Sequence, residues 1–256
     1  MKKLIVLSET VHDGLRFQSF QSLLDGFTLE GEFPPICPVA IDQNSFHTGF
    51  VLGNLVEMEE RYGRPQNTII YVDQQGASSF PFAVIRLATG LIVCGRSVGN
   101  CFSFITPKIH IMQSYKRENS DAFDAHPRIL AQLMEFKDDE MLFEELHMNI
   151  IPQVRGLYIG HIANDGTVIT TLTAEDLKGR YEYGENVTIK VNNAELQTWY
   201  EPQKEEQHHS YILVPSPYTF QAVPYLMIQN RSYDISATSP SEALNTPVPG
   251  QEISIT

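Results

Sequence analysis

The amino-acid sequence predicts an α/β protein with two domains, a mostly parallel sheet domain at the N-terminus and an antiparallel β-barrel at the C-terminus. Short apolar runs alternate with helical patterns up to Ile151. Beyond Pro152 the expected strands are short and turn residues are frequent, which is typical of a small barrel. A length of 256 residues suits one large domain or two small ones, and the change of pattern favours two. We therefore expect an α/β domain over 1–152 and a β-barrel domain over 153–256.

The first half is expected to supply a mostly parallel sheet, with one hairpin inserted, and the helices that cover it. Leu4–Leu7 is entirely apolar, as expected for a strand buried on both faces. Further strands are predicted at Cys37–Ile41, Thr68–Val72 and Ile109–Met112, and a hairpin turning at Ala88-Thr89-Gly90 joins Phe82–Leu87 to Leu91–Cys94. Apolar residues at helical spacing predict helices over Leu15–Phe27, over Phe46–Met58 and within Asp121–Phe136.

The second half reads as strands separated by tight turns. Asn164-Asp165-Gly166 is a strong hairpin turn between Tyr158–Ile162 and Thr167–Leu172. Ser239-Pro240 is expected to open a short helix, with serine as the cap and proline at the first helical position. The remaining strands are predicted at Val187–Val191, Glu195–Tyr200, Tyr211–Val214, Tyr225–Ile228, Tyr233–Ala237 and Glu252–Ile255.

Charge and composition exclude several partners. A formal net charge of −13 repels phosphate backbones and anionic lipids, so we expect neither nucleic acid nor membrane as a partner. The acidic stretch from Asp138 to Glu145 is interpreted as solvated surface. The first apolar run is shorter than the roughly 7–15 residues of a secretory signal, and three cysteines without a signal fit a reducing cytoplasmic location.

Two carboxylates follow predicted strands and are the first candidates for a site. Glu9 comes after the first strand and Asp73 after Thr68–Val72. In an open parallel sheet, ligands bind beyond the carboxyl ends of the strands. A carboxylate there can accept hydrogen bonds from a ribose diol or polarise a small nucleophile, although it can equally cap a turn. The histidines and cysteines lack metal-binding spacing, so no metal site is expected.

The segment Ile69-Ile70-Tyr71-Val72-Asp73, with Gly95 and Gly99 some twenty residues later, resembles the S-adenosylmethionine hydroxide adenosyltransferases, relatives of the fluorinases and chlorinases. Gly166 and Thr170 also match the family pattern I-D-x-F-G-N-x-x-T-N-I over Ile162–Leu172. The resemblance implies an α/β N-terminal domain, a C-terminal β-barrel and a homotrimer. In that family the site lies between the N-domain of one subunit and the C-domain of the next.

The resemblance also implies a set of site residues. Asp73 would be catalytic, because the family places an aspartate there at the start of D-P-G-V-G-S-x-R. Glu9 stands where the family uses an aspartate on the ribose. The other ligand-binding residues implied by the resemblance are Ser78, Gly99, Thr167 and Arg231. Arg231 falls where the halogenases place an arginine that can hold the methionine carboxylate, which an arginine fork suits.

Two positions depart from the catalytic pattern. The hydrolytic members use an Asp-Arg-His trio to orient water or hydroxide for attack on the ribose C5′ carbon. Here the arginine position is Phe80 and the histidine position is Glu118, so Asp73 alone remains. The sequence therefore favours a protein that binds S-adenosylmethionine or a related adenine nucleoside and leaves open whether it is an enzyme. Two alternatives are an active hydrolase that yields adenosine and methionine, and a non-catalytic oligomeric scaffold. No cofactor is expected beyond S-adenosylmethionine as substrate or ligand.

Overall fold

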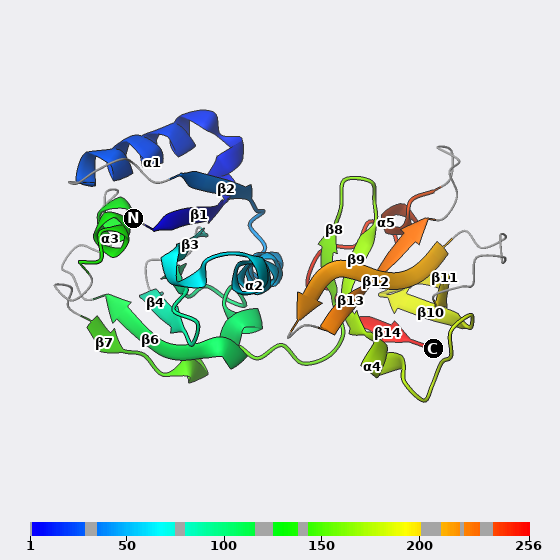
Figure 1. The fold of residues 1–256 in the computed structure, drawn as a ribbon. Helices are drawn as coiled ribbons and strands as arrows, with labels where there is room; N and C mark the ends of the chain where they lie inside the picture. The colour runs from blue at the N-terminus through cyan, green and yellow to red at the C-terminus, as the bar shows by residue number, and fades with distance from the viewer. Residues whose placement is uncertain are drawn as a thin grey trace. The chain divides into compact units, whose positions relative to one another are not determined.

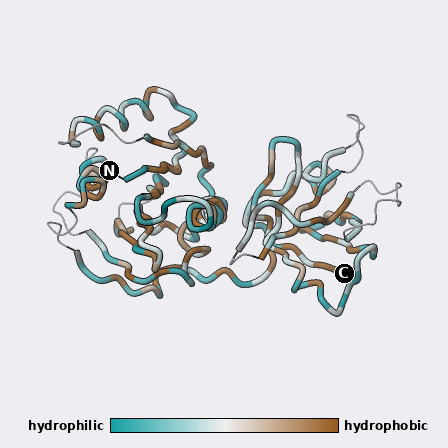
Figure 2. The backbone as a smooth tube through the Cα atoms, viewed as in Figure 1, coloured by the Kyte–Doolittle hydropathy of each residue, from teal (hydrophilic) through white to brown (hydrophobic). Residues whose placement is uncertain are grey.

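The chain divides into two compact units, Met1–Gln153 and Val154–Thr256 (Figure 1). The structure is a computed structural model that describes residues 2–28, 35–74, 80–115, 125–137, 143–200, 211–220, 223–230 and 238–256. The predicted strand Tyr233–Ala237 lies outside the described residues. Each unit has its own hydrophobic core, and the apolar residues are concentrated along the strands (Figure 2). Within the described part, no helix is both long and apolar enough to cross a bilayer.

A seven-stranded sheet forms the first unit, in the order β2-β1-β3-β5-β4-β6-β7. Strand β1 pairs in parallel with β2 and β3, and β3 pairs in parallel with β5. Strand β4 is antiparallel to both β5 and β6, and β6 is antiparallel to β7. The strands are β1 Lys3–Ser8, β2 Ile36–Ala40, β3 Thr68–Asp73, β4 Phe82–Leu87, β5 Ile92–Arg96, β6 Ile109–Tyr115 and β7 Phe143–Glu145.

The prediction of a mostly parallel sheet is therefore wrong, because this sheet is mixed. The β4–β5 hairpin is predicted by the sequence, and a connection that short permits only antiparallel pairing. The difference is that β6 also pairs antiparallel with β4, and β7 antiparallel with β6. Strand β7 comes from the acidic stretch for which the sequence predicts only solvated surface. Its residues Glu144 and Glu145 are at the edge of the sheet, where charged side chains discourage pairing with another chain.

Three helices cover the two faces of this sheet. Helix α1 (Gly14–Phe27) and helix α3 (Ala125–Met134) pack on the face that carries Leu4 and Tyr71. Helix α2 (Ser45–Tyr62) packs on the opposite face, which carries Ile5 and Ile70. Successive side chains of β1 and β3 point to opposite faces, so both strands are buried on both sides. This burial explains why their sequences are continuous apolar runs.

The second unit is a seven-stranded sheet that curls into a nearly closed barrel, in the order β14-β10-β11-β12-β13-β9-β8 (Figure 1). Hydrogen bonds from Ile159 N–H to the Gln251 carbonyl (2.9 Å) and from Gly250 N–H to the Ile159 carbonyl (2.8 Å) connect its two edges. The predicted hairpin turn around Gly166 is present, and a second hairpin turn at Asn192 joins the predicted strands Val187–Val191 and Glu195–Tyr200. The strands are β8 Ile159–Ile162, β9 Val168–Thr173, β10 Asn186–Val191, β11 Ala194–Tyr200, β12 Tyr211–Phe220, β13 Val223–Asn230 and β14 Ile253–Ile255.

One pairing in this sheet differs from the expected antiparallel arrangement. Strands β11 and β12 run parallel over two register pairs, Trp199 with Ile212 and Tyr200 with Leu213. Two short helices complete the unit, α4 (Ala174–Leu177) and α5 (Pro240–Ala243). Helix α5 begins as predicted, with the Ser239 side chain accepting a hydrogen bond from the Glu242 N–H.

A buried thiol predicts a loss of stability in alkali. Burial raises the pKa of Cys101 to about 12. A folded-state pKa above the unfolded value of roughly 8.5 contributes stability that is complete below that pH and is lost as the pH rises toward 12. We expect the unfolding free energy to fall between pH 9 and 11 less steeply in Cys101→Ala, by roughly 1 kcal/mol per pH unit. Urea unfolding at several pH values measures this slope. Ile105→Val, a change in the same core without a titrating group, should lower stability but keep the wild-type slope.

Candidate functional site

The ends of β1 and β3 bring two polar side chains together. Ser8 and Asp73 are register partners in this parallel pair, so the two strands end side by side. The Ser8 hydroxyl donates to Asp73 Oδ2 at 2.6 Å. The N–H of Thr10 donates to Ser8 Oγ at 3.0 Å, and the Thr10 hydroxyl lies 2.7 Å from the same oxygen. Ser8 is fully buried, whereas Asp73 is half-buried at the sheet edge. The sheet therefore fixes the Asp73 carboxylate at the predicted ligand-binding edge.

Tyr71 contacts the other oxygen of the same carboxylate. It precedes Asp73 by two residues and so points to the same face of β3. Its hydroxyl donates to Asp73 Oδ1 at 3.2 Å and lies 2.7 Å from Nδ1 of His126, which α3 supplies. Burial raises the pKa of Tyr71 well above its ordinary value, and the Asp73 charge adds to the effect. The phenol therefore keeps its proton at neutral pH.

Two buried acceptor atoms flank the Ser8–Asp73 pair along the chain. Glu9 begins the 3-10 helix Glu9–His12 directly after β1, and its Oε1 atom is buried without a hydrogen-bond donor in the described part of the chain. Gln74 directly follows β3 and is 5% exposed. Its Nε2 donates to the Gln43 carbonyl at 3.4 Å, but its Oε1 likewise accepts no hydrogen bond from the described residues. Buried acceptors without donors are costly, which suits a site completed by a hydroxyl or amino group of a ligand.

Gly99 follows β5, which is parallel to β3, so its loop leaves the sheet at the same edge as Asp73. Its φ of +49° is left-handed, and an added Cβ would overlap the Ser45 hydroxyl at the start of α2. Thr167 belongs to the second unit, where its N–H donates to Asp165 Oδ1 at 2.9 Å within the β8–β9 turn. The carboxyl ends of the parallel strands β1, β3 and β5 are thus followed by Glu9, Asp73 and Gly99 at the same side of the sheet. The predicted residues Ser78 and Arg231 lie outside the described residues.

Sequence reasoning did not single out Ser8, Tyr71, Gln74 or His126. The sequence could have indicated Tyr71, because it stands two residues before Asp73 in a predicted strand and so points to the same face of that strand. Nothing in the sequence indicates His126, since only the packing of α3 brings it to β3. Among the described residues no three histidine, cysteine, aspartate or glutamate side chains are grouped to hold a metal ion.

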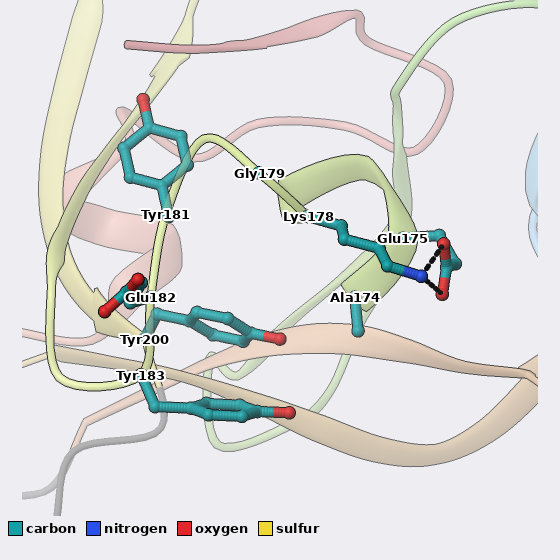
Figure 3. A pocket seen from close by; sticks show the side chains of 8 residues that line it. All are labelled: Ala174, Glu175, Lys178, Gly179, Tyr181, Glu182, Tyr183 and Tyr200. Atoms are coloured by element: carbon teal, nitrogen blue, oxygen red, sulfur yellow. Dashed lines mark hydrogen bonds and ion pairs between the residues drawn. The ribbon is translucent and has the colours of Figure 1, made fainter.

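A separate hollow of about 490 Å³ lies in the second unit (Figure 3). The rings of Tyr183 and Tyr200 lie one above the other, with their centroids 4.9 Å apart. Nζ of Lys178 points toward the Glu175 carboxylate at 3.2 Å. None of the predicted site residues lines this hollow; its lining is Ala174, Glu175, Lys178, Gly179, Tyr181, Glu182, Tyr183 and Tyr200.

The fold places the chain among proteins that combine an α/β unit with a nearly closed β-barrel unit. The sequence matches no family model, and it matches no curated protein. An uncharacterized conserved protein from Thermotoga maritima is similar over 99% of this chain and 100% of its own, with a TM-score of 0.69 and 14% identity. A conserved hypothetical protein from Thermus thermophilus is similar over the whole of both chains, with a TM-score of 0.63 and 13% identity. At these identities the likeness concerns the fold alone.

Proposed function

We propose that this protein binds S-adenosylmethionine or a related adenine nucleoside at the sheet edge that carries Glu9 and Asp73. The observation that supports it best is that a carboxylate follows each of β1 and β3. Asp73 accepts hydrogen bonds from Ser8 and Tyr71. Glu9 has a buried oxygen that accepts no hydrogen bond from the described residues. A ribose offers two adjacent hydroxyl donors, and carboxylate oxygens are acceptors. The resemblance to the S-adenosylmethionine hydroxide adenosyltransferases, whose pattern has an acid at both positions, supports the same ligand.

The proposal includes the quaternary structure that the resemblance implies. A cytoplasmic homotrimer would complete each site with residues from the C-terminal unit of a neighbouring subunit, and Thr167 and Arg231 are the candidates. Sedimentation equilibrium measures the mass in solution. A monomer at concentrations where ligand binds would remove this part of the proposal, because the second wall of the site would then be missing.

Binding without hydrolysis is the form we favour. Phe80 occupies the position where the family pattern has its arginine, and Glu118 occupies the histidine position. Hydroxide attack on a sulfonium substrate needs donors or cations arranged around the incoming oxygen. A carboxylate from Glu118 would add like charge to the site instead.

One observation favours an active hydrolase as the second candidate. The guanidinium of Arg96, at the end of β5, donates from Nη1 to the Phe80 carbonyl at 3.0 Å. A cation therefore reaches the residue where the family pattern has its arginine. In that reaction Asp73 would accept a proton from water, the oxygen would attack C5′ of the ribose, and methionine would leave with the sulfur electron pair.

Ligand-dependent melting tests the proposal. S-adenosylmethionine or adenosine should raise the melting temperature in a concentration-dependent manner, because a ligand stabilises the state that binds it. 2′,3′-Dideoxyadenosine, which lacks the diol, is the matched control and should cause a much smaller shift. Release of adenosine and methionine from S-adenosylmethionine, followed by chromatography, would favour the hydrolase. If millimolar nucleoside does not change the melting temperature, the proposal is contradicted. The non-catalytic oligomeric scaffold would then be the remaining alternative.

A further inference from the structure

Tyr71 lies between two polar groups and has a single hydrogen to donate. Its oxygen is 3.2 Å from Asp73 Oδ1 and 2.7 Å from His126 Nδ1. An ionised carboxylate can only accept hydrogen bonds, so the phenol hydrogen must point to Asp73 when Asp73 is ionised. The His126 contact is then a hydrogen bond only if Nδ1 carries a hydrogen and donates it to the Tyr71 oxygen. The opposite orientation would place two acceptor oxygens against each other at 3.2 Å.

We infer that Tyr71 and His126 are positioning residues for Asp73, forming an arm in which His126 Nδ1–H donates to Tyr71 and Tyr71 donates to the carboxylate. This inference rests on the proposed function only for its effect on ligand binding. The arm holds Oδ1 from the α3 side of the sheet, and Ser8 holds Oδ2 from β1. Among the described residues each carboxylate oxygen therefore has one donor, and it retains acceptor capacity for a ligand.

Aromatic rings pack against the arm, in which Tyr71 is buried and His126 is half-buried. The ring of Phe20 stacks on Tyr71 with centroids 5.6 Å apart and planes inclined by 10°. The ring of Phe82 lies 4.8 Å from the His126 ring. Tyr71 itself is 1% exposed. Hydrogen bonds in such an environment are stronger than in water, and a residue locked by packing transmits its orientation to the group that it holds.

The tautomer of His126 tests the arm without any ligand. Long-range ¹H–¹⁵N spectra of histidine-labelled protein near neutral pH should show a hydrogen on Nδ1 of His126, with the signal assigned by its loss in His126→Asn. In Tyr71→Phe the acceptor is gone, so the His126 signal should shift toward the Nε2–H form common in solution. Wild-type His126 with a bare Nδ1 would overturn the inference, and so would an unchanged tautomer in Tyr71→Phe.

Nucleoside affinity tests the functional consequence. Tyr71→Phe and His126→Ala should each weaken binding about 5–10-fold, the worth of roughly one hydrogen bond. His126→Asn should restore most of the affinity, because the amide nitrogen of asparagine can donate near the position of Nδ1. Tyr225→Phe removes a hydroxyl from another buried tyrosine, in the second unit, and should bind as wild type does.

The outcomes separate the arm from the proposed function. If folded His126→Ala, checked by its melting curve, binds nucleoside as tightly as wild type, the positioning role is wrong. If His126→Asn is as weak as His126→Ala, the donor role is wrong. If wild type binds no nucleoside, the proposed function fails, and the His126 tautomer still decides whether the arm exists.

Discussion

Alanine at Gly49 is expected to lower the free energy of unfolding of the first unit by about 3 kcal/mol, the upper range for overpacking. Gly49 lies in α2, where the helix meets the chain just after β5. An added Cβ would overlap the carbonyl oxygen of Asn100 and lie 3.3 Å from that of Cys101. Both atoms belong to the backbone, so relief requires movement of the helix or of the segment that precedes the 3-10 helix Ser103–Lys108. Urea unfolding, followed by circular dichroism, measures the change.

Gly26→Ala is the matched control for this prediction. Gly26 lies in α1, and an added Cβ would meet no atom within 4 Å. Alanine there should stabilise the unit by about 0.5–1 kcal/mol, because glycine is the poorer helix former. Similar effects of the two substitutions would show that helix propensity, and not the close approach at Asn100, determines the result at Gly49.

Asp73→Asn is expected to weaken nucleoside binding by at least about 10-fold. Hydrogen bonds to a charged group contribute roughly 1.5–3 kcal/mol, and each 1.4 kcal/mol is a factor of ten. Asparagine also turns one acceptor into a donor, and that donor would face either the Ser8 or the Tyr71 hydroxyl. Titration calorimetry with adenosine or S-adenosylmethionine measures the loss.

Asp25→Asn makes the same change of charge at an exposed position of α1. Its affinity should remain within about twofold of wild type, since exposed charges are largely screened. If Asp73→Asn and Asp25→Asn bind equally well, the nucleoside is bound elsewhere than at the β1–β3 edge.

Strand directions show where the sequence was insufficient. Apolar runs and turn signals correctly predicted β1, β3, β4 and β5, because burial on both faces leaves a continuous apolar pattern. The apolar runs do not indicate whether neighbouring strands pair in parallel or antiparallel. Beyond the predicted β4–β5 hairpin, β6 and β7 add in antiparallel pairing at the far edge, and this makes the sheet mixed. Likewise, β11 and β12 follow one another along the chain, and no local pattern in the sequence predicts that they pair in parallel.

The candidate site divides in the same way. Glu9 and Asp73 could be named from the chain alone, because a carboxylate directly after a buried strand must emerge at the strand's carboxyl end. The partners of Asp73 depend on packing across long separations: Ser8 is 65 positions away, and His126 lies 55 positions beyond Tyr71. Periodicity acts over a few residues, whereas the pairing of β1 with β3 and the docking of α3 are settled by burial of the whole core. The sequence alone thus identified Asp73 as a candidate. Ser8 is brought to it only by the pairing of β1 with β3, and His126 is brought to Tyr71 only by the packing of α3 on the sheet.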